Sequence, residues 1–190
     1  FSLFFLFFFC SKPIFFQNRV LRPTLRGEKS TQQNMDQLDS LNQVATFHRT
    51  FHHPVEPRPV IPAPERCRLR VSLLAEELSE LEEAIAENDI VAVADALCDL
   101  QYVLSGAVLE FGLGEKFRAL FDEVQRSNMS KACRNPAEAE ATVKYYEEER
   151  GVPCYYEEDN GLYLVYRKED RKTLKSVFYS PADLQQIVES

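Results

Sequence analysis

The sequence predicts an all-α protein: a helical bundle with about four main helices, followed by a small C-terminal β-hairpin and a short final helix. Two observations support this fold class. Apolar residues recur at helical spacing through most of residues 36–149, and beyond Gly151 the spacing changes to the two-residue period of strands. With 190 residues and 45% hydrophobic content, the chain is long enough for one domain with a sizeable core.

Each expected helix is bounded by residues that end helices. A short amphipathic helix is expected over residues 36–51, ended by Pro54. Residues 54–64 then carry five prolines, which predict an extended linker. The helices that follow are divided by Asn88-Asp89, by Gly112 and Gly114, and by Pro136, which suits a first turn. They are expected over residues 65–87, 89–111, 115–132 and 136–149.

The C-terminal part is predicted to form a β-hairpin followed by a short helix. Residues 154–157 and 162–166 have strand character, and the turn Asp159-Asn160-Gly161 between them is a strong hairpin signal. Ser180-Pro181 is expected to open a short final helix with Asp183 in its first turn.

Residues 1–34 do not resemble the rest of the chain. Phe makes up half of residues 1–16, and no acid appears before Glu28. This stretch is an organelle transit peptide, a truncated signal sequence, or upstream sequence translated in error before a start at Met35. We favour the last interpretation and expect an N-terminal extension that is disordered or not native. The remaining chain divides into a helical domain, residues 35–150, and the hairpin with its final helix, residues 151–190, appended to the same domain.

Charge and cysteine usage restrict the partners. A formal net charge of −8 argues against a polyanion-binding surface, so no nucleic-acid partner is expected. No membrane partner is expected either, because the apolar run Phe1–Cys10 is too short to span a bilayer. The five cysteines are widely separated and form no CxxC pair, as in thiols of a reducing compartment. We expect a cytoplasmic protein, or an organellar one if residues 1–34 are a transit peptide.

An acidic block is the main functional signal. From Val71 to Glu115 there are eleven Asp or Glu residues and no Lys or Arg. A solvated helix face is the ordinary explanation of such a run. Helical geometry places Glu77 at the edge of an expected core stripe and Glu80 slightly further round, so both are expected to be partly buried. The stripe consists of Leu74, Leu78, Leu81 and Ile85.

The expected helix over residues 89–111 is apolar nearly all round, which predicts burial. Its charged residues Asp95 and Asp99 lie at i and i+4, on one face with Tyr102. Buried charges must be paired or must bind metal, so the alternatives are metal coordination and a salt bridge to a distant residue such as Lys131. Four carboxylates, from Glu77, Glu80, Asp95 and Asp99, suit Mg²⁺ or Mn²⁺ rather than Zn²⁺. The matching chemistry is metal-assisted attack of water on a phosphoanhydride.

The acidic motifs resemble those of the MazG-like and phosphoribosyl-ATP pyrophosphohydrolase-like superfamily. The family pattern is ExxE, a spacer, then ExxD. Glu77, Glu80 and Asp99 match it, whereas Ala96 stands where the second half has Glu, and Asp95 is the suggested replacement. The resemblance covers about residues 36–189. It rests on Glu76-Glu77-Leu78-Ser79-Glu80-Leu81, Asp95-Ala96-Leu97-Cys98-Asp99-Leu100-Gln101-Tyr102, Phe111-Gly112-Leu113, Phe121-Asp122-Glu123-Val124, Ser127-Asn128-Met129-Ser130-Lys131 and Tyr179-Ser180-Pro181-Ala182-Asp183-Leu184.

The resemblance implies a homodimer or dimer of dimers that cleaves nucleoside triphosphates between the α and β phosphates, in nucleotide-pool housekeeping. It implies Mg²⁺, or Mn²⁺, on Glu77, Glu80 and Asp99, with Asp95 as a fourth ligand. Catalytic roles fall to Glu80 and to Glu76, the latter as a second ligand or as the base for water. The alternative functions are phosphoribosyl-ATP hydrolysis in histidine synthesis and nucleotide binding without turnover.

Substrate contacts are expected from three further residues. Asn128 and Lys131 are expected to hold phosphate oxygens, although Lys131 also suits a helix C-terminal cation. Tyr102, like Phe51, is a candidate for stacking on the base, with core packing as its ordinary alternative. The three histidines, His48, His52 and His53, are expected to pack at the surface or at the substrate's edge.

Overall fold

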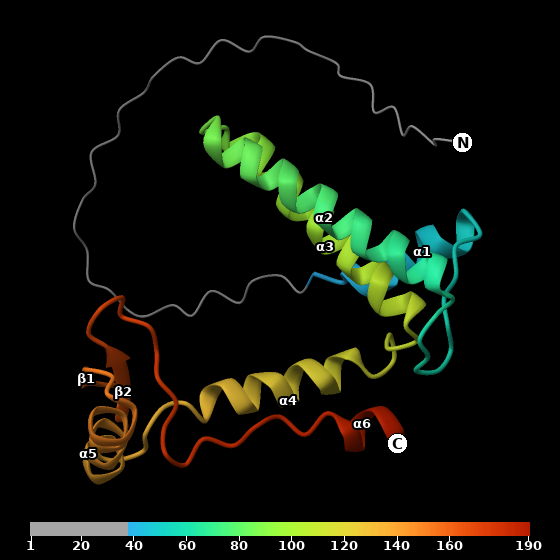
Figure 1. Ribbon diagram of the computed structural model, residues 1–190. Coiled ribbons are helices and arrows are strands. Elements are labelled where there is room, and N and C mark those ends of the chain that lie inside the picture. The colour runs from blue at the N-terminus through green and yellow to red at the C-terminus, as the bar shows by residue number, and fades with distance from the viewer. Residues whose placement is uncertain (1–37) are drawn as a thin grey trace, which may run out of the picture. The chain divides into compact units, whose positions relative to one another are not determined.

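The computed structural model describes residues 38–190 (Figure 1). It confirms the mostly helical class with a C-terminal two-stranded hairpin and a short final helix. The expected extension over residues 1–34 and the start at Met35 lie outside the described residues.

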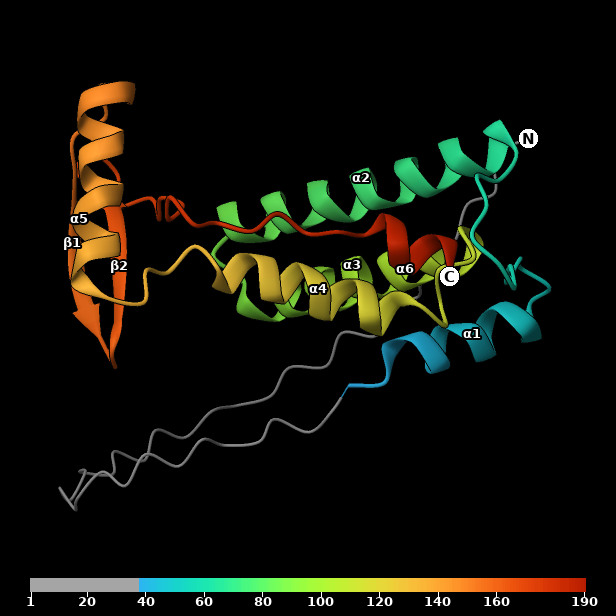
Figure 2. The same cartoon turned by 90° about the horizontal axis from the view of Figure 1, so that it is seen from below.

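Three helices form the N-terminal part of this structure. Helix α1, Ser40–Thr50, begins where the Asp39 carboxylate accepts a hydrogen bond from a backbone N–H, 3.4 Å away. Helix α2, Pro64–Ala86, begins on a proline, and α3, Ile90–Glu110, begins where Asp89 caps two backbone N–H groups. Asn88, at φ 55°, reverses the chain, so α2 and α3 lie side by side and antiparallel in both views (Figures 1 and 2).

The proline-rich linker packs against the end of α3. Its backbone N–H groups at Glu56 and Val60 donate to the carbonyl oxygens of Leu109 and Phe111, at 3.0 and 3.1 Å. Gly112 is required here, because its φ is +67° and a Cβ on it would lie 1.8 Å from a linker carbonyl oxygen. The predicted linker is therefore extended and also fixed in place.

A buried ion-pair group ties α2 to the last turn of α3. The carboxylate of Glu110, which is 0% exposed, accepts hydrogen bonds from the guanidinium groups of Arg66 and Arg70. His48 adjoins it, with Nε2 3.3 Å from the Arg70 guanidinium and Nδ1 2.8 Å from the carbonyl oxygen of Pro54. The surface position expected for His48 is wrong, because this side chain is only 2% exposed.

The expected burial of α2 and α3 is also partly wrong. Leu78 and Ile85, assigned to the core stripe of α2, are 50% and 61% exposed, whereas Arg70 and Ala84 on a neighbouring face are buried. In α3, apolar side chains such as Leu97, 51% exposed, face solvent in the single chain. The α2 and α3 helices bury only the faces that they turn toward each other and toward α1.

Helix α3 has the length and apolar composition of a membrane-spanning helix. Of the residues that the structure describes, Ile90–Glu110 form the helix that is long and apolar enough to cross a membrane. Length and composition alone are weak evidence of a membrane span; α3 packs along α2 and α1, but only 17% of its apolar window is buried in this structure.

The C-terminal part contains a helix packed on the hairpin. Helix α5, Pro136–Lys144, continues into a π-helical turn, Tyr145–Glu149, and packs on the antiparallel strands β1, Cys154–Asp159, and β2, Leu162–Arg167. Their turn is the predicted one, with Asn160 and Gly161 both at positive φ. The shared core consists of Cys133, Ala139, Cys154, Val165 and Leu174.

Helix α4, Phe117–Met129, lies beside the C-terminal segment that ends in α6, Gln185–Glu189 (Figures 1 and 2). The final helix therefore does not open at Ser180-Pro181 as expected. It begins five residues later, because the polar groups at Ser180 and Asp183 bond to α4 and do not cap α6.

Candidate carboxylate site on α2 and α3

The two paired helices bring the predicted acids together around Glu77. Partial burial and neighbouring negative charges together raise the pKa of the Glu77 carboxyl to about 7. Those charges belong to Asp99, Glu80, Glu76 and Asp95, in decreasing order of effect. The other four acids singled out from the sequence thus act on Glu77 across α2 and α3.

Asp95 and Asp99 differ from expectation in their surroundings. Both side chains are exposed in the single chain, so the burial inferred from the apolar helix is wrong. Partial desolvation and the charge of Asp95 nevertheless raise the pKa of Asp99. In the single chain Lys131 forms no ion pair with Asp95 or Asp99, and its ammonium donates to Asn128 Oδ1 at 2.8 Å.

Within residues 38–190, no Lys, Arg or His side chain forms an ion pair with this group of acids. Among residues 38–190, the ion pairs involve other carboxylates, and none includes Glu77, Glu80, Asp95 or Asp99. The same residues hold no three His, Cys, Asp or Glu side chains already arranged to bind a metal ion. The negative charges that act on Glu77 thus lack a cationic side-chain partner within residues 38–190, and a proton or a bound cation would relieve their repulsion.

The departure at Ala96 has a structural counterpart. Ala96 is 4% exposed and lies on the packed side of α3, whereas Asp95 is exposed. The charge of Asp95 acts on both Glu77 and Asp99. Asp95 thus adds a negative charge to the group around Glu77, although position 96 has no acid.

An aromatic group lies one helical turn from Asp99. Tyr102, 39% exposed, meets the ring of Phe47 edge-on at 5.6 Å. Phe47 also contacts the rings of Phe51 and His53, at 4.5 and 5.9 Å. Sequence reasoning named Tyr102 and Phe51 but missed Phe47, whose i, i+4 spacing to Phe51 on an amphipathic helix was the available signal.

Asn128 and Lys131 lie at the C-terminal end of α4, one turn apart, as predicted. Their side chains bond to each other, and neither is among the groups that shift the pKa of Glu77 or Asp99. The structure thus brings the five acids together but does not bring these two residues into contact with them in one chain.

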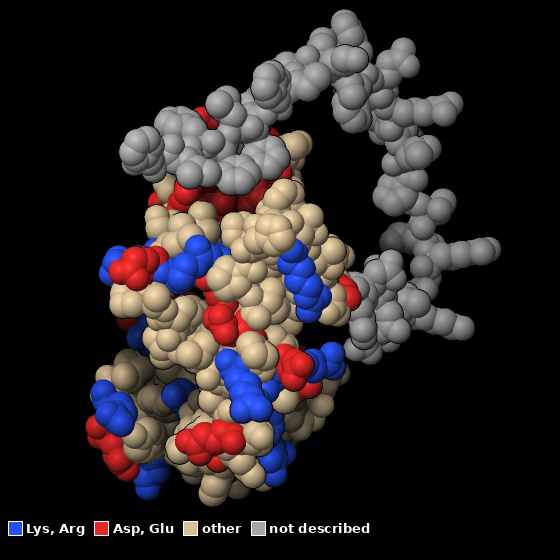
Figure 3. All heavy atoms as spheres, turned by 90° about the vertical axis from the view of Figure 1, so that its right-hand side faces the viewer, with Lys and Arg blue, Asp and Glu red and all other residues tan. Residues whose placement is uncertain are grey.

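Figure 3 shows how the charged side chains are distributed over one face of the molecule. In Figure 3, Lys and Arg side chains are interspersed with Asp and Glu among broad uncharged areas. On this face the basic side chains do not gather into a single patch, in agreement with the acidic composition.

These features define a helical domain that carries, on an antiparallel helix pair, a group of carboxylates without ion-pair partners among residues 38–190. Residues 44–128 match the family model "Phosphoribosyl-ATP pyrophosphohydrolase", a span that runs from α1 to the last turn of α4. Residues 44–128 therefore form a phosphoribosyl-ATP pyrophosphohydrolase domain, of the MazG-like all-α NTP pyrophosphatase superfamily.

The chain is also similar to "Uncharacterized protein L479" of Acanthamoeba polyphaga mimivirus. The two are 28% identical over 106 residues, which cover 54% of this chain and 42% of that protein. The match thus spans less than half of the viral protein's length.

Proposed function

We propose that this protein is a Mg²⁺-dependent nucleoside triphosphate pyrophosphohydrolase that cleaves (d)NTPs between the α and β phosphates, giving monophosphate and pyrophosphate. Membership of the pyrophosphohydrolase family supports an activity of this kind. The observation that carries the proposal is the group of four acids whose charges act on Glu77 across α2 and α3, none of the five being ion-paired within residues 38–190.

The donor set fits a hard divalent cation. Carboxylate oxygens are the ligands that Mg²⁺ and Mn²⁺ prefer. The pKa of Glu77 is raised by partial burial and by negative charge that no side chain of the described residues neutralises. Glu77, Glu80, Asp95 and Asp99 would hold the ion. When bound, the cation stabilises negative charge on phosphate oxygens.

The protein's own groups supply the remaining functions. Glu76 and Glu80 are exposed carboxylates beside Glu77, so either can accept the proton of an attacking water as a general base. The exposed ring of Tyr102 offers a face for the nucleobase. Asn128 and Lys131 are the proposed contacts to phosphate oxygens.

A second copy of the chain is part of this proposal. Large apolar side chains remain exposed on α2 and α3, and an exposed apolar surface of this kind marks an association site. We expect a homodimer or a dimer of dimers in which a partner covers these apolar side chains. The exposed apolar side chains on α2 and α3 are Val71, Leu78, Ile85, Ile90, Val91, Leu97 and Leu104.

Glu80→Gln tests the role of the acids, because it removes one charge from the cluster and keeps the side chain's size. We expect it to lower pyrophosphate release from a (d)NTP panel at least a hundredfold, as removal of a catalytic acid–base group does. Glu87→Gln is the matched control, because Glu87 lies at the end of α2 and does not act on Glu77. Equal activity in wild type and Glu80→Gln would contradict the proposed site.

Phosphoribosyl-ATP is the alternative substrate, and the description of the matched family favours it. Both substrates share the triphosphate, so the carboxylate cluster does not distinguish them. Two results together would establish the alternative. Expression of this chain would restore growth of a histidine auxotroph, and kcat/KM for phosphoribosyl-ATP would exceed kcat/KM for every (d)NTP.

Nucleotide binding without turnover is the second alternative, favoured by the missing acid at Ala96. It requires Mg²⁺-dependent binding of a triphosphate with no product after hours of incubation.

A further inference from the structure

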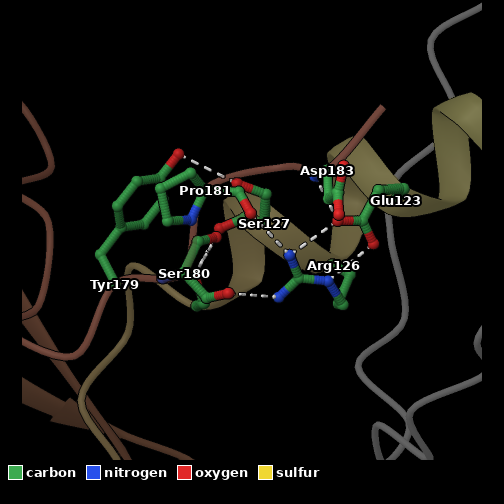
Figure 4. A network of polar contacts seen from close by, with 8 residues as sticks. Glu123, Arg126, Ser127, Tyr179, Ser180, Pro181 and Asp183 are labelled. Atoms are coloured by element: carbon green, nitrogen blue, oxygen red, sulfur yellow. Dashed lines mark hydrogen bonds and ion pairs between the residues drawn. The ribbon is translucent and has the colours of Figure 1, made fainter. Parts of the chain in front are cut away.

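The C-terminal segment, residues 176–183, is bound along α4 by a hub at Arg126 (Figure 4). The Arg126 guanidinium donates to the Glu123 carboxylate at 2.7 and 2.8 Å within the helix. It also donates to Ser180 Oγ at 3.1 Å and to the carbonyl oxygen of Pro181 at 2.9 Å. One side chain of α4 thus holds two consecutive residues of the segment.

Flanking contacts extend this attachment in both directions. The backbone N–H of Asp183 donates to the Glu123 carboxylate at 2.9 Å, so the helix acid binds both the hub and the segment. These bonds hold the pKa of Glu123 at about 2. On the other side, the hydroxyls of Tyr179 and Ser127 share a hydrogen bond of 2.9 Å, drawn in Figure 4.

The segment also reaches the end of α4, where the candidate phosphate contacts lie. The backbone N–H of Ser180 donates to Ser130 Oγ at 3.0 Å, and that of Ser176 donates to the carbonyl oxygen of Lys131 at 3.1 Å. The Lys131 ammonium in turn donates to Asn128 Oδ1. Backbone atoms of the turn that carries Asn128 and Lys131 are therefore bonded directly to the segment.

Other elements hold α4 only weakly. Extensive packing joins α2 to α3, α1 to α3, and α5 to the hairpin, but none of it involves α4. At the opposite end of α4, the Lys116 ammonium donates to the carbonyl oxygen of Ile187 at 2.9 Å, so the C-terminal residues attach to both ends of the helix. The segment lies beyond residue 128, where the family match ends.

We propose that residues 176–183 are a strap that fixes the C-terminal turn of α4, and that Arg126 is a positioning residue for Asn128 and Lys131. The inference rests on the proposed function, in which those two residues bind triphosphate. Arg126 does not touch the substrate. It acts by keeping the strap seated, which keeps the turn ordered before the nucleotide arrives.

The test compares Arg126→Gln with Arg118→Gln in the full chain. Arg118 is an exposed arginine of the same helix, and its ion-pair partner among residues 38–190 is Asp122, so its variant removes the same charge and leaves the strap contacts intact. In Arg126→Gln we expect amide exchange in residues 176–183 to accelerate at least tenfold. We also expect KM for the nucleotide to rise about tenfold while kcat changes less than twofold. The lost hydrogen bonds position Asn128 and Lys131 for nucleotide binding and do not take part in the chemical step.

A conservative variant and a second site guard against general misfolding. Arg126→Lys keeps the charge but not the three-way hydrogen bonding, so its KM should lie between those of wild type and Arg126→Gln. Tyr179→Phe removes one strap contact without changing charge and should raise KM in the same direction. The proposal is overturned if strap exchange stays at the wild-type rate, if KM is unchanged while the strap is released, or if Arg118→Gln has the same effects.

Failure of the proposed function gives a different pattern. If wild type releases no pyrophosphate from any nucleotide, the enzymatic proposal fails. The strap is then judged by exchange of residues 176–183 and by the affinity for a non-hydrolysable triphosphate in the same variants. Tenfold weaker binding in Arg126→Gln supports the strap, and unchanged binding overturns its positioning role.

Discussion

Glu110 provides the sharpest test of the packing that holds α2 against α3. This carboxylate is fully buried and binds two guanidinium groups, whose side chains are 32% exposed for Arg66 and 8% exposed for Arg70. Glu110→Gln keeps the side chain's volume and one acceptor oxygen but removes the negative charge. Arg70 then remains buried without a counter-charge, whereas Arg66 can turn partly into solvent.

The expected loss of unfolding free energy follows from the different exposure of the two arginines. Removing one partner of a buried ion pair costs roughly 3–5 kcal/mol, and the partial exposure of Arg66 places this case near 3 kcal/mol. The melting temperature should fall by roughly 6–12 °C for a chain of this size.

The effect should depend on pH. Burial alone would raise the pKa of Glu110, but the hydrogen bonds from Arg70 and Arg66 outweigh it, so the pKa lies below its ordinary value of 4.5. The stability that Glu110 contributes is therefore present above pH 4.5 and lost as the pH falls through the lower folded value. The difference between wild type and Glu110→Gln should shrink in acid.

Urea unfolding at neutral pH and in acid measures both effects. Glu65→Gln is the control, because Glu65 and its partner Arg68 have side chains 75% and 70% exposed and an exposed pair contributes about 0.5 kcal/mol or less. A loss below about 1 kcal/mol in Glu110→Gln would refute the assignment of this pair as a buried structural link.

Three further outcomes are expected. Gly112→Ala should destabilise the fold by about 2 kcal/mol or more in urea unfolding, because its Cβ would meet the Arg58 carbonyl at a positive φ; a neutral result would mean that the linker is not fixed. Leu97→Asp should shift the chain toward a single copy in sedimentation velocity, because an exposed apolar face is lost; unchanged mass would place the interface elsewhere. The pKa of Glu77 is raised from 4.5 to about 7, so the folded state binds more protons in that range and unfolding free energy should decline as pH rises from 4.5 to 7, by about 1–2 kcal/mol after solvent screening. Glu77→Gln should remove this decline, and an identical pH profile would contradict the clustering.

Features set by neighbouring residues were predictable from the sequence. The breaks at Asn88-Asp89 and around Gly112 place the ends of α2 and α3 to within a few residues, and the Asn160-Gly161 turn gives the hairpin. The grouping of Glu77 with Asp99 was also predictable, because helical spacing and the short loop between α2 and α3 bring these faces together.

Features set by contacts distant in sequence were not predictable. Glu110 finds its arginines 40 and 44 residues away, and no local pattern distinguishes it from the other acids of the block. Ser180-Pro181 has the composition of a helix start, but the Ser180 hydroxyl is bound by Arg126, 54 residues earlier. The burial of α3 was overestimated because an apolar helix predicts that its faces are covered without saying whether the same chain covers them.

Phosphorus NMR of a (d)NTP incubated with the protein and Mg²⁺ tests the proposed chemistry most directly, because it identifies both products. We expect pyrophosphate and nucleoside monophosphate in equal amounts, and no reaction when the cation is chelated. Orthophosphate with nucleoside diphosphate would contradict cleavage between the α and β phosphates, and undiminished turnover without a divalent cation would contradict the carboxylate site.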